Sequence, residues 1–235
     1  MIPQVVYEDG FLVVINKPAG WIVNSVDTTT SQPVLEEWIK SNFKFPIFKF
    51  PELRHGIVHR LDKPTSGVLL VAKTENAFAY LQSQFKERKT MKEYLALVHG
   101  KLDPQEGNVK VPVGRLPWNR ERFGVLPGGR GSETDYSVIN YYEDNSEKYS
   151  LVSFKPKTGR THQIRIHAKY LRHPIVADTF YAGRKTARKD LKWCDRLFLH
   201  AHKISILHPD THELVTYEAP LAEDLQKALS VLKLI

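Results

Sequence analysis

The stretch HGIVHRLDKPTSGVLLVAKT, residues 55–74, decides how the chain around it folds. Its apolar run from Val68 to Ala72 is continuous and rich in β-formers, which predicts a strand buried on both faces. Pro64 and Gly67 predict a tight turn directly before that strand. The polar half of the stretch is therefore expected to form a loop that a core strand holds in place.

That loop carries three charged side chains, Arg60, Asp62 and Lys63. Asp62 lies between two cations, so its ionised form should be favoured. Groups that a protein must hold firmly are placed on loops of this kind. The loop is a candidate site for chemistry, and the alternative is a capped turn with a surface ion pair.

Composition limits the classes of protein that the chain can belong to. It has 235 residues, of which 42% are hydrophobic and 26% are charged, as in soluble globular proteins. The formal net charge of +8 favours a polyanionic partner, with nucleic acid ahead of an anionic membrane surface. The alternative is a basic enzyme whose charge has no such role.

The lone cysteine and the N-terminus point to an intracellular protein. Cys194 excludes a disulfide within the chain, and the surrounding LKWCDR resembles no nucleophile signature, which favours a packing role. The first residues lack the pattern of a signal peptide, and no apolar run is long enough to span a membrane. A soluble, cytoplasmic protein is expected.

Hydrophobic periodicity predicts more strands than helices. Strands are expected over 4–7, 11–16, 68–72, 91–100, 134–143, 148–156, 174–178, 197–209 and 212–220. Helices are expected over 33–43, over 75–89 behind the cap Thr74, across Ile164, Ala168 and Leu171, and over 220–232. Residues 44–54 and 180–195 are predicted to be irregular. Because no regular βαβ alternation occurs, the predicted fold is α+β, with a mostly antiparallel mixed sheet flanked by helices and loops.

Residues 103–133 are rich in glycine, proline and arginine and form the most flexible-looking segment. Its arginines are Arg115, Arg120, Arg122 and Arg130, and its aromatic residues are Trp118 and Phe123. Arginines interleaved with aromatic rings suit contacts with an RNA backbone and its bases. A solvated hairpin arm is the equally weighted alternative.

Motifs for other chemistry are missing from the sequence. There is no phosphate-binding or dinucleotide-binding glycine loop and no zinc-protease motif. His200 and His202 could approach a metal from one strand face, but a structural role is favoured because no carboxylate partner is evident. Asp62, Tyr94 and Arg165 remain as candidates. A single aspartate that an arginine keeps ionised suits covalent or base catalysis at a sugar or base ring.

The stretch HRLDKPTSGVLLVAKT, residues 59–74, resembles the signature of the RluA-type RNA pseudouridine synthases. Other segments resemble the same family in the expected order: FLVVINKPAGWIV at 11–23, KEYLALVHG at 92–100, GRTHQIRIH at 159–167, then HPIVADTFY, LFLHA and APLAEDL. The resemblance covers nearly the whole chain. It implies the fold of that family, with a central RNA-binding cleft.

The resemblance assigns expected roles to four residues. Asp62 would be the catalytic residue that attacks the target uridine. Tyr94 would stack on the uracil ring and assist removal of the C5 proton, and Arg165 would pair with Asp62. Arg60 would fill the gap that a flipped base leaves. Whether Asp62 attacks C1′, attacks the base or removes a sugar proton stays open.

The same resemblance implies an isomerase that needs no metal and no cofactor. Further expected substrate-binding residues are His59, Thr65, Gly67, Ile164, Arg115 and Arg130. The partner would be ribosomal or transfer RNA, in a stem-loop, bound by a monomer with no obligate protein partner. A single catalytic domain over 1–235 is expected, with no separate S4-type RNA-binding domain.

Two other functions remain open from the sequence. One is a catalytically silent RNA-binding protein or chaperone on the same scaffold, although pure binding would not require Asp62, Tyr94 and Arg165 together. The other is a glycosidase acting on a nucleoside-like substrate, which would release free uracil from RNA.

Overall fold

A computed structural model describes residues 1–24, 31–117 and 119–235. These divide into two compact units. Unit 1 comprises residues 1–92 and 201–220, and unit 2 comprises residues 93–200 and 221–235. Trp118 lies outside the described residues, and so does the side chain of Arg120.

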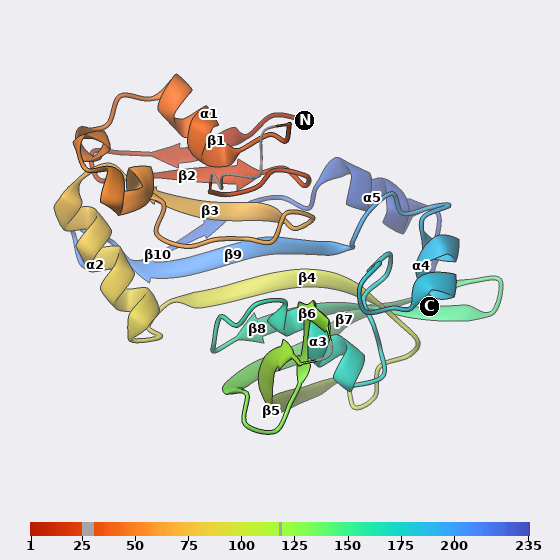
Figure 1. Ribbon diagram of the computed structural model, residues 1–235. Helices are drawn as coiled ribbons and strands as arrows, with labels where there is room; N and C mark the ends of the chain where they lie inside the picture. The colour runs from red at the N-terminus through yellow and green to blue at the C-terminus, as the bar shows by residue number, and fades with distance from the viewer. Residues whose placement is uncertain (25–30, 118) are drawn as a thin grey trace. The chain divides into compact units, whose positions relative to one another are not determined.

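The sheet of unit 1 begins with the two predicted N-terminal strands, which form a hairpin. Its strands are β1 (Gln4–Glu8), β2 (Leu12–Lys17), β3 (Ser66–Ala72), β9 (Leu199–Leu207) and β10 (Leu214–Glu218). They follow the order β1-β2-β3-β9, and β10 pairs with β9 (Figure 1). The Asp9 carboxylate accepts the backbone N–H groups of Phe11 and Leu12 at 2.7 and 2.9 Å, which fixes the first turn.

Strand β3 is the predicted core strand. Every one of its residues is buried, and it pairs antiparallel with β2 in a register that places Leu70 opposite Val14. A continuous apolar run therefore forms a strand with both faces covered, as the sequence predicts.

The helices of unit 1 are α1 (Leu35–Asn42) and α2 (Glu75–Lys86). The Thr74 hydroxyl accepts the Ala77 N–H at 3.2 Å, which confirms the predicted N-cap of α2. Residues 44–54 fall largely in two 3-10 helices, η1 (Pro46–Lys49) and η2 (Pro51–Gly56), where a wholly irregular loop was predicted. Proline stands at the start of each, where the missing N–H is harmless.

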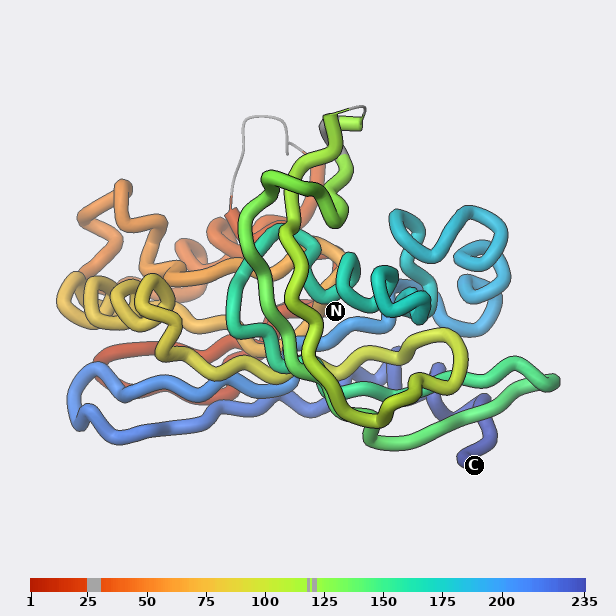
Figure 2. The backbone as a smooth tube through the Cα atoms, turned by 90° about the horizontal axis from the view of Figure 1, so that it is seen from below, coloured from red at the N-terminus to blue at the C-terminus, as the bar shows by residue number. Residues whose placement is uncertain are grey.

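The sheet of unit 2 contains the segment that looked most flexible in the sequence. Its strands are β4 (Met91–His99), β5 (Glu106–Leu116), β6 (Asn119–Val125), β7 (Arg130–Asp144), β8 (Glu147–Pro156) and β11 (Lys233–Leu234). The order is β4-β8-β7-β5-β6, with β11 paired to β7. Figure 2 shows β5 alongside β7, which its antiparallel register confirms. The arginine-rich segment is thus largely a sheet extension.

The helices of unit 2 are α3 (Gln163–Tyr170), α4 (Arg184–Asp190) and α5 (Glu223–Ser230). Helix α4 lies in the basic segment that was predicted to be irregular. The strand predicted over 174–178 is wrong, because only an isolated bridge joins Ile175 to Val98. Strands and helices otherwise follow the predicted α+β pattern. The pairs β1–β2, β2–β3 and β9–β10 of unit 1 are antiparallel, and so are β4–β8, β5–β7 and β7–β8 of unit 2.

The described residues lack two features of other classes of protein. No helix among them has the length and apolarity needed to cross a membrane. Within the same residues, no three His, Cys, Asp or Glu side chains gather as a metal site would require. His202, one of the histidines considered for a metal, instead contacts the Ala219 carbonyl and Glu218 at 3.0 and 3.3 Å.

Candidate active site

The loop of residues 59–65, called here the Asp62 loop, is a short turn that leads into β3. The Thr65 N–H donates to the Asp62 carbonyl at 3.0 Å and closes the turn. Asp62 is half-buried, whereas Arg60 and Lys63 are exposed. The structure therefore places the aspartate on the anchored loop that the sequence predicts, with both neighbouring cations open to solvent.

A buried lysine ties the Asp62 loop to the N-terminal hairpin. The Lys17 side chain is fully buried, and its ammonium donates to the carbonyls of Pro18 and Trp21, each at 3.0 Å. It also reaches the Lys63 carbonyl at 3.4 Å, which accepts the Gly20 N–H at 2.8 Å. Several carbonyl acceptors offset the desolvation of this charge. The sign of this role in the sequence is that Lys17 follows directly on the apolar run of a predicted strand.

His59 anchors the start of the Asp62 loop to β3. Its Nε2 accepts the Leu70 N–H at 3.0 Å, and its ring stacks on Phe85 with centroids 4.8 Å apart. Burial lowers the pKa of His59 from 6.5 to about 3, and the charge of Lys92 adds to the effect. The neutral ring is thus the form that fits the fold. A substrate contact by His59 stays a prediction.

The titration of His59 predicts a specific loss of stability in acid. The unfolded chain binds a proton near pH 6.5, whereas the folded chain does so only near pH 3. His59 therefore contributes fully above pH 6.5, and its contribution is lost as the pH falls from 6.5 towards 3. A His59→Gln variant keeps an acceptor for Leu70 but does not titrate. Between pH 6 and 4.5, the unfolding free energy of this variant, measured in urea, should fall less steeply than that of the wild type. The difference between the two slopes should be about 1.4 kcal/mol per pH unit. Parallel curves for the two proteins would contradict this role.

Gly67 has a structural reason to be glycine. A Cβ at this position would lie 2.1 Å from the Ala201 carbonyl oxygen, and the backbone φ of +117° is one that other residues rarely adopt. The glycine thus lets β3 and β9 approach closely just after the Asp62 loop. Its expected contact with substrate stays a prediction.

The hydroxyl of Thr65 is buried but makes no hydrogen bond within the described residues. The side chain is 2% exposed. A buried hydroxyl in this state lowers stability. A Thr65→Val variant is therefore expected to keep or raise the unfolding free energy, by up to about 1 kcal/mol, in urea titrations.

Thr158 is the matched control for that prediction. It is equally buried, but its Oγ1 accepts the Glu133 N–H at 3.1 Å and donates to Gln163 at 2.7 Å. Thr158→Val should lose about 1–3 kcal/mol. A comparable loss in Thr65→Val would show that the Thr65 hydroxyl has a stabilising partner.

Arg165 lies on α3 and is held by an aspartate from the following loop. Its Nε and Nη2 donate to Oδ2 and Oδ1 of Asp178 at 2.9 and 2.8 Å. The guanidinium also faces the rings of Phe180 and Tyr181, with centroids 5.3 and 5.0 Å away. The bidentate pair and the two rings fix the orientation of the arginine. The predicted pairing of Arg165 with Asp62 stays a prediction.

Asp178 is a residue that sequence reasoning did not single out. Its Oδ1 also accepts the N–H groups of Phe180 and Tyr181 at 2.9 and 3.1 Å, so the carboxylate organises its own turn. An aspartate after the short apolar run PIVA, close in sequence to an arginine-bearing helix, was the available signal. The resemblance over HPIVADTFY includes Asp178 but assigns it no role.

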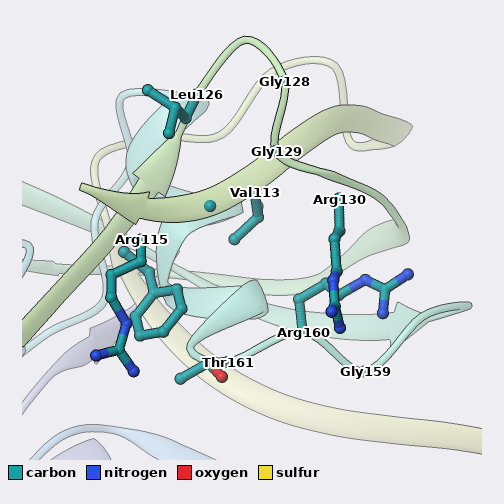
Figure 3. A pocket seen from close by; sticks show the side chains of 11 residues that line it. Val113, Arg115, Leu126, Gly128, Gly129, Arg130, Gly159, Arg160 and Thr161 are labelled. Carbon is teal, nitrogen blue, oxygen red and sulfur yellow. The ribbon is translucent and has the colours of Figure 1, made fainter. Parts of the chain in front are cut away.

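The remaining predicted residues of unit 2 lie in different surroundings. Tyr94 is half-buried on β4, where its backbone pairs with Phe154 of β8. Ile164 is buried in the main core of the unit, so it supports α3. Arg115 and Arg130 line one pocket, together with Arg160 (Figure 3). Unit 1 thus carries Asp62, and unit 2 carries Tyr94 and Arg165.

Comparisons with known proteins identify the family of the chain. Residues 11–170 match the family model described as RNA pseudouridylate synthase. An uncharacterised RNA pseudouridine synthase of Synechocystis is 36% identical over 98% of this chain and 69% of its own length. Ribosomal large subunit pseudouridine synthase D of Neisseria meningitidis serogroup B is 36% identical over the whole chain. The chain spans 62% of that relative's length.

A solved structure resembles the described fold. It is human RNA pseudouridylate synthase domain containing 1, with a TM-score of 0.76 and 26% identity, over 99% of this chain and 89% of that one. RNA pseudouridine synthases are isomerases that convert uridine in RNA to pseudouridine. The match over most of the chain, the relatives and the anchored HRLD loop together show that this chain belongs to the RNA pseudouridylate synthase family.

Proposed function

We propose that this chain isomerises uridine to pseudouridine in RNA, with Asp62 as the catalytic residue. The observation that carries the proposal is the Asp62 loop, whose aspartate is half-buried on a turn tied to β3 and, through Lys17, to the N-terminal hairpin. Such anchoring suits a group that must meet a reacting atom with little freedom.

The reaction breaks the N1–C1′ bond of uridine, turns the uracil and joins C5 to C1′. The proton at C5 is lost and N1 gains one, so the atoms balance without an external reactant. Asp62 attacks the uridine, and Tyr94 stacks on the ring and assists the proton transfer at C5. Arg165, oriented by Asp178, pairs with Asp62 and holds its carboxylate in position. Arg60, exposed on the loop, fills the place of the flipped base.

The substrate is a uridine in a structured RNA, and a ribosomal or transfer RNA stem-loop fits best. Support comes from the net charge of +8 and from relatives named for the large ribosomal subunit. The two units work as a single catalytic domain in a cytoplasmic monomer.

The direct test is a product assay. Purified protein is incubated with total RNA from a strain that lacks the gene, and the RNA is digested to nucleosides and analysed by mass spectrometry. Pseudouridine is expected to increase, with no release of free uracil. Free uracil would instead indicate a glycosidase, and binding without any product would indicate a silent RNA-binding protein.

A further inference from the structure

A pocket in unit 2 collects three arginine side chains from separate segments. It has a volume of about 380 Å³, within the range of small-ligand sites. Arg115 comes from β5, Arg130 begins β7, and Arg160 belongs to the loop before α3. The remaining lining residues are Val113, Gly114, Phe123, Leu126, Gly128, Gly129, Gly159 and Thr161.

The charge of this pocket is uncompensated within the described part of the chain. No carboxylate there forms an ion pair with Arg115, Arg130 or Arg160. Arg160 is steadied by its Nε, which donates to the Gly131 carbonyl at 3.2 Å and leaves the terminal nitrogens of its guanidinium for a ligand. Three cations that share one hollow favour an anion, and guanidinium groups match phosphate oxygens in geometry.

One wall of the pocket is a firmly packed glycine turn. The Leu126 N–H donates to the Pro112 carbonyl at 3.1 Å, and the Gly129 N–H donates to the Leu126 carbonyl at 2.9 Å. A Cβ on Gly129 would lie 2.8 Å from the carbonyl carbon of Val113, so only glycine lets the turn lie against β5. The wall is therefore preformed, which lowers the entropic cost of binding.

The pocket has two chemically different ends, as Figure 3 shows. Arg130 and Arg160 lie at one end, and Arg115 lies at the other. The Arg115 guanidinium lies over the Phe123 ring, with its Cζ 5.1 Å from the ring centroid, in a cation–π contact. A guanidinium plane held on an aromatic ring is a surface on which an unpaired base can stack.

We propose that this pocket binds one unpaired nucleotide of the RNA. Arg130 and Arg160 hold its phosphate, and its base stacks on Arg115. The inference rests on the proposed function, because it takes RNA as the ligand, and it assigns the pocket to a single-stranded segment rather than to a duplex. A base in a duplex is already stacked and paired, so its face cannot lie on Arg115.

The first experiment tests the phosphate end by RNA binding, without reference to catalysis. The Arg130→Gln/Arg160→Gln variant is compared with wild type in fluorescence anisotropy titrations of a single-stranded RNA oligonucleotide at several salt concentrations. Its Kd should rise about tenfold or more at low salt. The slope of log affinity against log salt should become shallower by about 0.7, as for one lost phosphate contact.

The matched control is Lys110→Gln/Lys155→Gln. It removes the same charge from the same unit at exposed positions outside the pocket. This control should bind RNA with a Kd within about twofold of wild type, because it reduces only the long-range electrostatic attraction between the protein and RNA. Equal losses in the two double variants would overturn the proposal, because they would show a diffuse charge effect.

The second experiment tests the stacking end. Arg115→Lys keeps the charge and loses the planar group, so affinity for the single strand should fall about fivefold or more, with little change for the matching duplex. An equal loss of affinity for both RNAs, or no loss for either, would overturn the assignment of an unpaired base.

The binding experiments and the product assay test the two proposals separately. RNA binding without pseudouridine formation would reject the proposed function alone. Pseudouridine formation with unaltered RNA binding by both variants would reject the pocket alone.

Discussion

Replacement of Asp62 with asparagine is expected to abolish pseudouridine formation while the fold is retained. The amide has nearly the same size but can act neither as nucleophile nor as base, so the rate should fall by a factor on the order of 10⁴ or more. Because Asp62 is half-buried on a turn closed by backbone atoms, the melting temperature should change little. Single-turnover assays with the RNA substrate measure the rate.

Asp210→Asn is the control for that result. It makes the same chemical change in the same unit, at an exposed position in the turn between β9 and β10. This variant should retain wild-type activity and stability. An Asp62→Asn protein that keeps more than a tenth of the wild-type rate would exclude an essential chemical role for the aspartate.

Replacement of Asp178 with asparagine is expected to have the largest effect on stability. The Asp178 side chain is fully buried, and its partner Arg165 is 4% exposed. Loss of the carboxylate breaks a bidentate ion pair between two buried side chains, which costs about 3–5 kcal/mol of unfolding free energy. Activity should fall as well, since the orientation of Arg165 depends on the pair. Urea unfolding followed by circular dichroism measures the loss of stability.

Asp224 offers a matched comparison in the same unit. It pairs with Arg196 through two contacts at 2.6 and 2.9 Å, but these side chains are 24% and 14% exposed. Asp224→Asn should cost about 1 kcal/mol, because water solvates the arginine that remains. If both variants lost the same free energy, burial would not be the reason for the role of Asp178.

Much of the fold can be predicted from short-range patterns in the sequence. The cap at Thr74 and the spacing of Ala77, Leu81 and Phe85 predict α2, and the first hairpin follows from apolar runs on either side of Asp9 and Gly10. The apolar periodicity over 220–232 predicts the helix α5, in which Leu225 is buried. These elements are encoded by residues close together in the sequence.

Other features depend on contacts that no local pattern shows. The segment 180–195 is dominated by basic residues, so its periodicity is weak, yet α4 forms there with Asp190 buried at its end. Asp190 accepts the Ala177 N–H at 2.8 Å, 13 positions earlier in the chain. Lys17 in the hairpin and Asp178 beside Arg165 likewise gain their roles from partners on other segments. Resemblance located the predicted catalytic set, and packing revealed what supports it.

The division of the chain into two units affects how it folds during synthesis. Strand β3 has β2 on one side and β9 on the other, yet most of β9 is made only after residues 93–200, which belong to unit 2. While a ribosome translates them, the edge of β3 that β9 will cover has unpaired backbone N–H and C=O groups that can pair with other polypeptides. A nascent chain that stalls before Leu199 is therefore expected to aggregate more readily than the full chain.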